Sequence, residues 1–244
     1  PITGAATIEI DLIVSGSRTD ARLRVADKEN GGKADALNAG LNLARYRYIC
    51  TVDGDTIYHP DALLRAMRLP MRDPATVIGV TSQVSISSRP EEHVGQAPGA
   101  ARVDDNWLMA FQLLDYLRAF VNNRLGWARW NFMLCSVGAF AVWRRDVVEE
   151  LGGFSGHFTC EDIEFTFRVH EMCRREGRPY RVVALADSVG RTEGPDTVRS
   201  LISQRARWQR VITETVWHYR RMVFNRRYGS VGWLGVPYYI LGEV

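Results

Sequence analysis

Residues 48–55 read Tyr-Ile-Cys-Thr-Val-Asp-Gly-Asp, an apolar run that stops at an acidic turn. A short apolar run bounded by an Asp-Gly turn is typical of a buried β-strand, so we expect a strand over Tyr48–Val52. Another strand is expected over Ile8–Val14, ending at Ser15-Gly16-Ser17. Between them, Gly31-Gly32 precedes apolar residues at helical spacing, which are Ala34, Leu37, Leu41 and Ala44. This part of the chain therefore predicts a strand, a helix and a strand.

The same alternation continues downstream. His59-Pro60-Asp61 opens a predicted helix that runs past Met67, and Val77–Val80 is a further strand candidate. Strands and helices in alternation argue for an α/β fold with a mainly parallel sheet flanked by helices. A chain of 244 residues in this class is expected to form a single domain. Because ligands of such sheets bind beyond the carboxyl ends of the strands, the turn after Val52 is a candidate site.

The second half of the chain is less regular. A polar stretch over 87–102 with several prolines and glycines is expected to be a surface loop, and strands are expected over 136–143 and 182–186. Helices are predicted over 107–125, 161–175 and 196–219. The first of these has a predicted apolar side of Leu108, Phe111, Leu114, Leu117 and Val121. The second has two apolar rows, one of Phe165, Val169 and Met172 and one of Ile163, Phe167 and His170.

Charge and cysteine content limit the class of partner and compartment. The formal net charge is only +3, but arginines crowd the region 205–227, which indicates an anionic partner such as phosphate groups or an acidic membrane face. The four cysteines are Cys50, Cys135, Cys160 and Cys173. They lie in or beside apolar or helical stretches rather than in a spaced framework, as expected of free thiols in the cytosol.

The end of the chain is apolar and aromatic. Residues 1–20 lack the pattern of a signal peptide, and no stretch reaches the roughly 20 apolar residues that span a bilayer. Residues 231–244 directly follow the arginine-rich region and contain Trp233, Tyr238 and Tyr239, which suit a membrane interface. We therefore expect a domain over 1–230 and the start of a membrane-interface segment over 231–244. The alternative is a final helix or strand that docks on the domain.

Asp53 and Asp55 are candidate metal ligands. Two carboxylates at one strand end repel each other unless a cation joins them, and Mg²⁺ or Mn²⁺ is often held by one or two carboxylates together with substrate phosphates. The turn thus predicts a metal-bound diphosphate, and the alternative is an Asp-Gly turn whose side chains cap their own backbone. Lys33, at the predicted start of a helix, could lie near phosphate, or could simply belong to a loop.

Two further groups of residues could take part in chemistry. Asp162 stands near a predicted helix N-terminus, where the dipole favours a carboxylate that accepts a proton, although burial would be needed to raise its basicity. Glu161 and Asp162 could instead only complement the helix end. Gln204, Arg207 and Trp208 share one helix face and could supply an amide, a phosphate-binding guanidinium and a flat surface for a sugar ring. The alternative is a solvated basic helix with one core tryptophan.

In their order along the chain, these motifs resemble the family 2 glycosyltransferases, in particular the membrane-bound branch that includes cellulose, chitin and hyaluronan synthases. The resemblance runs from about Arg24 to the chain end. Its motifs are Gly31 to Gly40, Asp53-Gly54-Asp55, Ser136 to Phe140 with Arg144-Arg145-Asp146, Gly152-Gly153-Phe154, Glu161-Asp162 and Gln204-x-x-Arg207-Trp208.

The resemblance implies a GT-A fold and an inverting transfer of a hexosyl or N-acetylhexosaminyl group from a nucleotide-sugar, most often a UDP-sugar. Asp53 would face the nucleotide, Asp55 would bind Mg²⁺ or Mn²⁺, and Asp162 would be the general base. Lys33 and Glu161 would lie at the donor, Arg207 would offset charge on the diphosphate, and Trp208 would be the floor of the acceptor site. The acceptor would be a glycan or a lipid-linked sugar, and no nucleic-acid partner is expected.

By the same resemblance, the domain would lie on the cytosolic face of the inner (plasma) membrane, next to flanking membrane helices that this sequence does not show, and could synthesise polysaccharide. The chain departs from the family at its start, where Ser15-Gly16-Ser17 stands in place of an Asp-Gly-Ser turn and no earlier strand is found. Val211 and Cys160 replace the usual glycine and threonine. These two replacements leave processivity open. Because Ser15 stands where the family has an aspartate for donor recognition, the alternative function is a catalytically silent nucleotide-sugar-binding or assembly subunit with the same fold.

Overall fold

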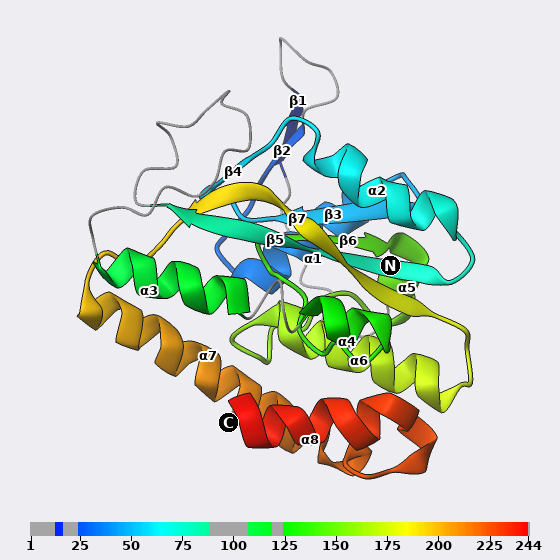
Figure 1. Cartoon of the computed structure of the whole chain (residues 1–244). Helices are drawn as coiled ribbons and strands as arrows, with labels where there is room; N and C mark the ends of the chain where they lie inside the picture. Colours follow the sequence, from blue (N-terminus) through cyan, green and yellow to red (C-terminus); the bar gives the residue numbers. More distant parts are fainter. Residues whose placement is uncertain (1–12, 17–23, 88–106, 119–123, 244) are drawn as a thin grey trace.

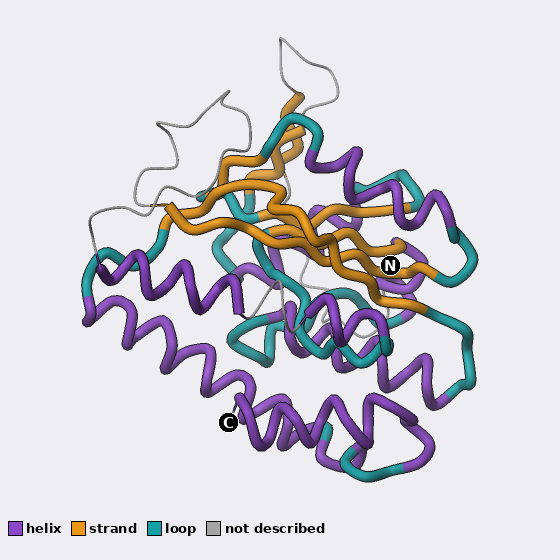
Figure 2. Tube along the Cα trace, in the orientation of Figure 1, coloured by secondary structure: helices purple, strands orange, loops and turns teal. Residues whose placement is uncertain are grey.

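The chain folds around one central sheet with helices on both faces, as seen in a computed structural model that describes residues 13–16, 24–87, 107–118 and 124–243 (Figures 1 and 2). The sheet has five strands in the order β3-β6-β5-β7-β4. Their bounds are Tyr48–Val52 for β3, Thr56–Tyr58 for β4, Val77–Ser87 for β5, Phe140–Arg144 for β6 and Arg181–Glu193 for β7. The predicted α/β class is confirmed.

The sheet is less parallel than predicted. Only β5 and β7 pair in parallel, whereas the β3–β6, β6–β5 and β4–β7 pairs are antiparallel. Apolar runs identify a strand but not its neighbours. Here β6 arrives from far downstream and inserts between β3 and β5, so that Trp143 stands opposite both Ile49 and Gly79. The expectation of a mainly parallel sheet was wrong for this reason.

Alternation of side chains along the strands divides the core between the two faces of the sheet. Val80, Val142 and Val183 face helix α2 (Ala62–Arg72), where Ala62 and Ala66 pack on them. Ala141 and Val182, which directly precede Val142 and Val183, belong to the core on the opposite face. Ile78 also lies in that core, because an irregularity between Val77 and Gly79 shifts the alternation of β5. That second face is covered by α1 (Lys33–Leu43), α4 (Leu125–Arg129), α5 (Arg145–Glu150) and α6 (Glu161–Arg175).

Helix α6 is buried between the sheet and an outer helical layer (Figure 1). Its row of Phe165, Val169 and Met172 packs in the core against the sheet. Ile163 and Phe167, from its other row, pack against α7 (Val198–His218) and the segments that follow it. The two predicted rows thus contact two different cores, except that His170 of the second row hydrogen-bonds to Tyr180 and Met133 of the core against the sheet. These contacts fix the orientation of the helix start that carries Glu161 and Asp162.

The first strand does not join the central sheet. β1 (Ile13–Gly16) and β2 (Arg24–Asp27) form a separate antiparallel pair, with Ile13 opposite Asp27 and Gly16 opposite Arg24. The expected strand end at Ser15 was therefore wrong, because Ser15 and Gly16 pair within the strand, and β2 was not predicted. Residues 8–12 and Ser17 lie outside the described part of the chain.

Helix α3 (Trp107–Tyr116) buries a different face from the predicted one. Leu108, Met109, Gln112 and Tyr116 are buried, while Phe111, Leu114 and Leu117 are exposed. The helix is apolar around most of its circumference, so its contacts with Ile86 and Gly194, and not its periodicity, decide which side is covered. Val121 and the expected loop over 88–102 lie outside the described residues.

Past α7 the chain makes several short helical segments. They are η3 (Arg220–Met222), η4 (Arg226–Tyr228), η5 (Val231–Gly235), α8 (Val236–Tyr238) and η6 (Tyr239–Glu243). One side of the final stretch docks on the domain through Val231, Val236 and Tyr239, while Trp233 and Leu234 are exposed. Within the described ranges, no helix has the length and apolar character needed to cross a bilayer.

Candidate active site

A cavity of about 740 Å³ lies where the turn between β3 and β4, the start of α6 and one face of α7 meet. Every side chain that the sequence predicts for the site lines it. These residues are Lys33, Asp53, Asp55, Glu161, Asp162, Gln204, Arg207 and Trp208. The fold therefore brings four distant segments of the chain to one place.

The turn that carries Asp53 and Asp55 is held by backbone hydrogen bonds above the start of β6. The N–H of Asp53 donates to the carbonyl of Ala139 (3.2 Å) and to the hydroxyl of Tyr58 (3.0 Å). That hydroxyl in turn donates to the Ala139 carbonyl at 2.5 Å. Tyr58 was not predicted as a site residue, because nothing in the sequence shows that its side chain folds back over the turn.

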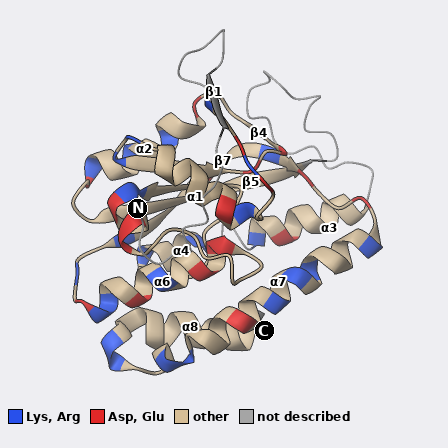
Figure 3. Ribbon diagram, turned by 180° about the vertical axis from the view of Figure 1, so that it is seen from behind, with Lys and Arg blue, Asp and Glu red and all other residues tan. Residues whose placement is uncertain are grey.

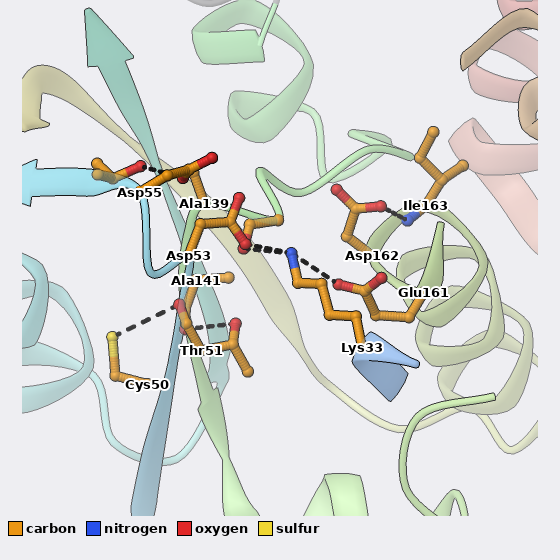
Figure 4. A network of polar contacts seen from close by, with 12 residues as sticks. Lys33, Cys50, Thr51, Asp53, Asp55, Ala139, Ala141, Glu161, Asp162 and Ile163 are labelled. Atoms are coloured by element: carbon orange, nitrogen blue, oxygen red, sulfur yellow. Dashed lines mark hydrogen bonds and ion pairs between the residues drawn. The ribbon is translucent and has the colours of Figure 1, made fainter. Parts of the chain in front are cut away.

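Lys33 connects the turn to α6 (Figure 4). Its Nζ forms an ion pair with Asp53, a second with Glu161 at 3.2 Å, and donates to the carbonyl of Gly138 at 3.3 Å. Burial opposes the charged form of Lys33, but the two carboxylates outweigh this effect and raise the pKa of the ammonium above its ordinary value. Lys33 therefore stays charged at the centre of the cavity.

Asp162 is the most strongly perturbed acid in the cavity. Burial, followed by the neighbouring charge of Glu161, raises the pKa of its carboxyl to about 6, although Lys33 and the N–H of Ile163 act in the opposite direction. Asp162 is therefore buried, as an increase in its basicity requires. Such a carboxylate is ionised at neutral pH and is still a stronger base than an ordinary aspartate.

Gly138 permits the close approach of Asp162 and Lys33. A Cβ at this position would lie 2.8 Å from Asp162 Oδ2 and 3.2 Å from Lys33 Nζ, so both side chains would have to move to make room for it. The backbone of Asp162 is also fixed, because its carbonyl accepts hydrogen bonds from the hydroxyls of Ser136 and Thr166. Gly138 stands in one of the sequence motifs, but the motif gave no reason for a glycine there.

Helix α7 forms the opposite wall and carries a row of basic residues (Figure 3). Gln204 Oε1 is buried without a hydrogen-bond partner among the described residues, and Arg207 is exposed at the cavity. Cys160, directly before α6, also lines the cavity, and burial, with Asp162 and Glu161 nearby, raises the pKa of its thiol to about 12. It is therefore a neutral thiol, and all four cysteines are free.

The residues fit a divalent metal that is held jointly with a substrate. Within the described ranges, no group of three or more His, Cys, Asp or Glu side chains could hold an ion unaided. Asp55 is exposed at the cavity, and from the described residues its carboxylate accepts only a long hydrogen bond of 3.4 Å, which the Thr56 hydroxyl donates. One or two carboxylates completed by phosphate oxygens is a usual arrangement for Mg²⁺. Asp55, with Asp53, meets that requirement.

Comparison with solved structures defines the class of the fold. The chain resembles a mannosyltransferase from Pyrobaculum calidifontis, determined in complex with GDP-Man and Mn²⁺, with a TM-score of 0.55 and 19% sequence identity. The match covers 87% of this chain and 52% of that one. The fold is thus that of a GT-A glycosyltransferase.

The family follows from the sequence match. A family model described as glycosyl transferase family group 2 matches residues 48–242, and the chain belongs to this family. Similar curated proteins include the poly-beta-1,6-N-acetyl-D-glucosamine synthase of Staphylococcus aureus (24% identity over 183 residues, 74% of this chain) and an N-acetylglucosaminyltransferase of Mesorhizobium japonicum (26% over 188 residues, 76% of this chain). The aligned region spans 39% and 41% of these relatives. The predicted family 2 glycosyltransferase is confirmed.

Proposed function

We propose that the chain is the catalytic domain of an inverting glycosyltransferase that moves a sugar from a UDP-sugar to a glycan or a lipid-linked acceptor. The convergence of Lys33, Asp53, Asp55 and Asp162 with the α7 face in one cavity carries this proposal. Both curated relatives named above contain N-acetylglucosamine in their names, which supports an N-acetylhexosaminyl group as the first to test.

The donor end of the cavity consists of Lys33, Asp53, Asp55, Glu161 and Asp162. The oxygen of the acceptor hydroxyl forms a bond to the anomeric carbon of the donor sugar, and Asp162 takes the proton of that hydroxyl. The bond from that carbon to the diphosphate oxygen breaks on the opposite side, so the configuration inverts. With a pKa of about 6, Asp162 is mostly ionised at neutral pH and ready to accept the proton.

Negative charge then grows on the departing diphosphate. Lys33 keeps its charge because Glu161 and Asp53 pair with it, and Arg207 lies exposed on the opposite wall. Fixed cations near a leaving group stabilise a transition state more than a ground state. Mg²⁺ or Mn²⁺ bound by Asp55 and Asp53 would supply further positive charge to the diphosphate.

The acceptor end consists of Gln204 and Trp208 together with the α3 residues Asp115 and Tyr116 that line the same cavity. The indole of Trp208 offers a flat surface to a sugar ring. The buried Oε1 of Gln204 can accept a hydrogen bond from a sugar hydroxyl, which would satisfy its unpaired lone pairs. Whether the enzyme adds one sugar or many depends on how the product moves along this end, and we propose processive synthesis.

The same proposal includes attachment to the cytosolic face of the inner (plasma) membrane through residues 231–244. Trp233, Leu234 and Leu241 are exposed, and the exposed Arg226 and Arg227 precede them. Aromatic and apolar side chains next to arginines are typical of segments that contact an anionic lipid surface.

Calorimetric titration of UDP with and without Mn²⁺, followed by incubation with a panel of nucleotide-sugars, tests the function. We expect Mn²⁺-dependent binding of UDP and turnover of at least one UDP-sugar. Binding without any turnover would indicate the silent nucleotide-sugar-binding subunit. Absence of UDP binding in both conditions would reject the proposed donor.

A further inference from the structure

Arg205 lies within the Gln204 to Trp208 motif, but its surroundings differ from those of Arg207. Its guanidinium lies 4.6 Å from the ring centre of Trp208 and 6.0 Å from that of Tyr116. It also forms an ion pair of 2.8 Å with Asp115 on α3. Among the described residues, no acidic side chain pairs in this way with Arg207. The two arginines of the motif, Arg205 and Arg207, therefore make different contacts.

Helix α3 is itself fixed where it meets Trp208. The amide of Gln112 donates to the carbonyl of Pro195, just before α7, at 2.8 Å. Met109 packs closely on Gly194, since a Cβ added to Gly194 would lie 3.1 Å from the terminal methyl group of Met109. Trp208 packs against the small core of Ile86, Met109 and Tyr116. The indole is therefore held by α3 on one side and by Arg205 on another.

Arg205 already has a carboxylate partner, since Asp115 pairs with it at 2.8 Å and with Arg118 at 3.1 Å. A guanidinium that pairs with a carboxylate and stacks on an aromatic ring is oriented by both partners, because its plane must satisfy both at once. A phosphate would have to displace Asp115 to bind there, whereas Arg207 is available at the cavity without that cost. The geometry favours a role in orienting Trp208 over a role in binding the donor.

We infer that Arg205 is a positioning residue for the acceptor, which fixes the Trp208 indole as the sugar platform, and that Asp115 holds Arg205 in place. The helix α3 thereby becomes part of the acceptor site. This inference rests on the proposed sugar transfer, since it assigns Trp208 to the acceptor. It adds two residues, Arg205 and Asp115, whose removal should weaken acceptor use and leave the donor end intact.

The first test needs no turnover. The chain has seven tryptophans, so the near-UV circular dichroism of Trp208 is taken as the difference between the wild type and W208F. The same difference is then measured between R205M and R205M/W208F. We expect the Trp208 signal to be largely lost without Arg205, because the indole is no longer held in one orientation. An unchanged difference spectrum would overturn the inference, whatever the activity.

The second test separates acceptor from donor. With a nucleotide-sugar that the wild type uses as donor, the acceptor KM of R205M and of D115N should be about three- to tenfold higher than that of the wild type. This is the range expected from loss of a stacked cation. Hydrolysis of the donor in the absence of acceptor should fall far less than transfer does. R205K keeps the ion pair but not the planar stack, and so should lie between R205M and the wild type.

The exposed Arg210, on the same helix but away from the cavity lining, gives the matched control R210M. This variant should leave both the Trp208 signal and the acceptor KM unchanged. A fall in donor hydrolysis equal to the fall in transfer would mean that Arg205 acts on the donor, and would refute the positioning role. Failure of the wild type to use any nucleotide-sugar would reject the proposed function, but the spectroscopic test would still stand.

Discussion

At the donor end of the cavity, the acidic side chains are attached to backbone that is hydrogen-bonded to the central sheet and to α6. At the acceptor end, the contacts between α3 and α7 are made mainly by side chains, and both members of the Asp115–Arg205 pair are about one-third exposed. Backbone hydrogen bonds within a packed core hold positions more rigidly than partly solvated side-chain pairs. The proposed chemistry thus lies at the end that backbone hydrogen bonds hold, and the proposed sugar platform lies at the end that side-chain contacts hold.

This difference predicts unequal sensitivity to substitution. Small changes at the donor end should remove activity, because a displacement of about 1 Å in a reacting group can cost about a hundredfold in rate. Changes at the acceptor end should alter affinity gradually.

Substitution of Lys33 should have the largest effect among them. K33M removes the cation that pairs with Asp53 and Glu161 and leaves these acids next to Asp162 without compensation. We expect the transfer rate to fall by about 10² to 10³-fold, as for loss of a fixed group that stabilises the transition state. The chain's only other lysine, Lys28, pairs with Asp35, and K28M is the matched control for steady-state kinetics. Equal losses of transfer rate in K33M and K28M would contradict the proposed role of Lys33 at the donor end.

Adding one methyl group at Gly138 should be almost as damaging. G138A places a Cβ against Asp162 and Lys33, so both must shift, and kcat should fall about a hundredfold. The control G40A introduces the same methyl group in a helix where it meets open space. Unfolding curves should show that both variants remain folded. A fully active G138A would show that Asp162 and Lys33 need not lie where they do.

The transfer rate should depend on pH through Asp162. Its pKa is raised to about 6, so the carboxylate is protonated, and unable to act as a base, as the pH falls below that value. Between pH 7 and pH 5 the rate should drop about tenfold, as the ionised fraction does. The profile is measured at saturating donor and acceptor. A rate that stays constant across this range would exclude Asp162 as the titrating base.

Removal of the Tyr58 hydroxyl should have the smallest effect. Y58F loses the hydrogen bonds to Asp53 and Ala139, while the direct bond from the Asp53 N–H to the Ala139 carbonyl remains. We expect a loss of about 1 kcal/mol in the free energy of unfolding and a few-fold weaker Mn²⁺-dependent binding of UDP. The control Y46F changes an exposed tyrosine. If UDP binding were unaffected, the turn would not depend on Tyr58.

The sequence predicted those parts of the molecule that depend on local pattern. The strand before Asp53, the two apolar rows of α6 and the shared face of Gln204, Arg207 and Trp208 follow from periodicity and spacing, and the structure has them. The position of Lys33 beside Asp53 could be anticipated only through the resemblance to a family, because twenty residues of chain separate them.

The rest depends on contacts between distant segments. The insertion of β6 between β3 and β5 makes most of the sheet antiparallel. No local sequence pattern indicates which strands will pair with β6. Helix α3 is apolar on nearly every side, so its buried face could not be chosen from periodicity. The roles of Tyr58 and Arg205 arise from contacts with Ala139 and Asp115, which only the folded chain brings near.

The central claim is that Asp162 is the base of a sugar transfer that occurs at the donor end. The most direct measurement compares transfer by D162N with transfer by D61N, which changes an exposed aspartate at the start of another helix, α2. We predict that D162N binds UDP with Mn²⁺ as the wild type does but transfers sugar at least about a thousandfold more slowly. D61N should behave as the wild type. Transfer by D162N at the wild-type rate would contradict the account.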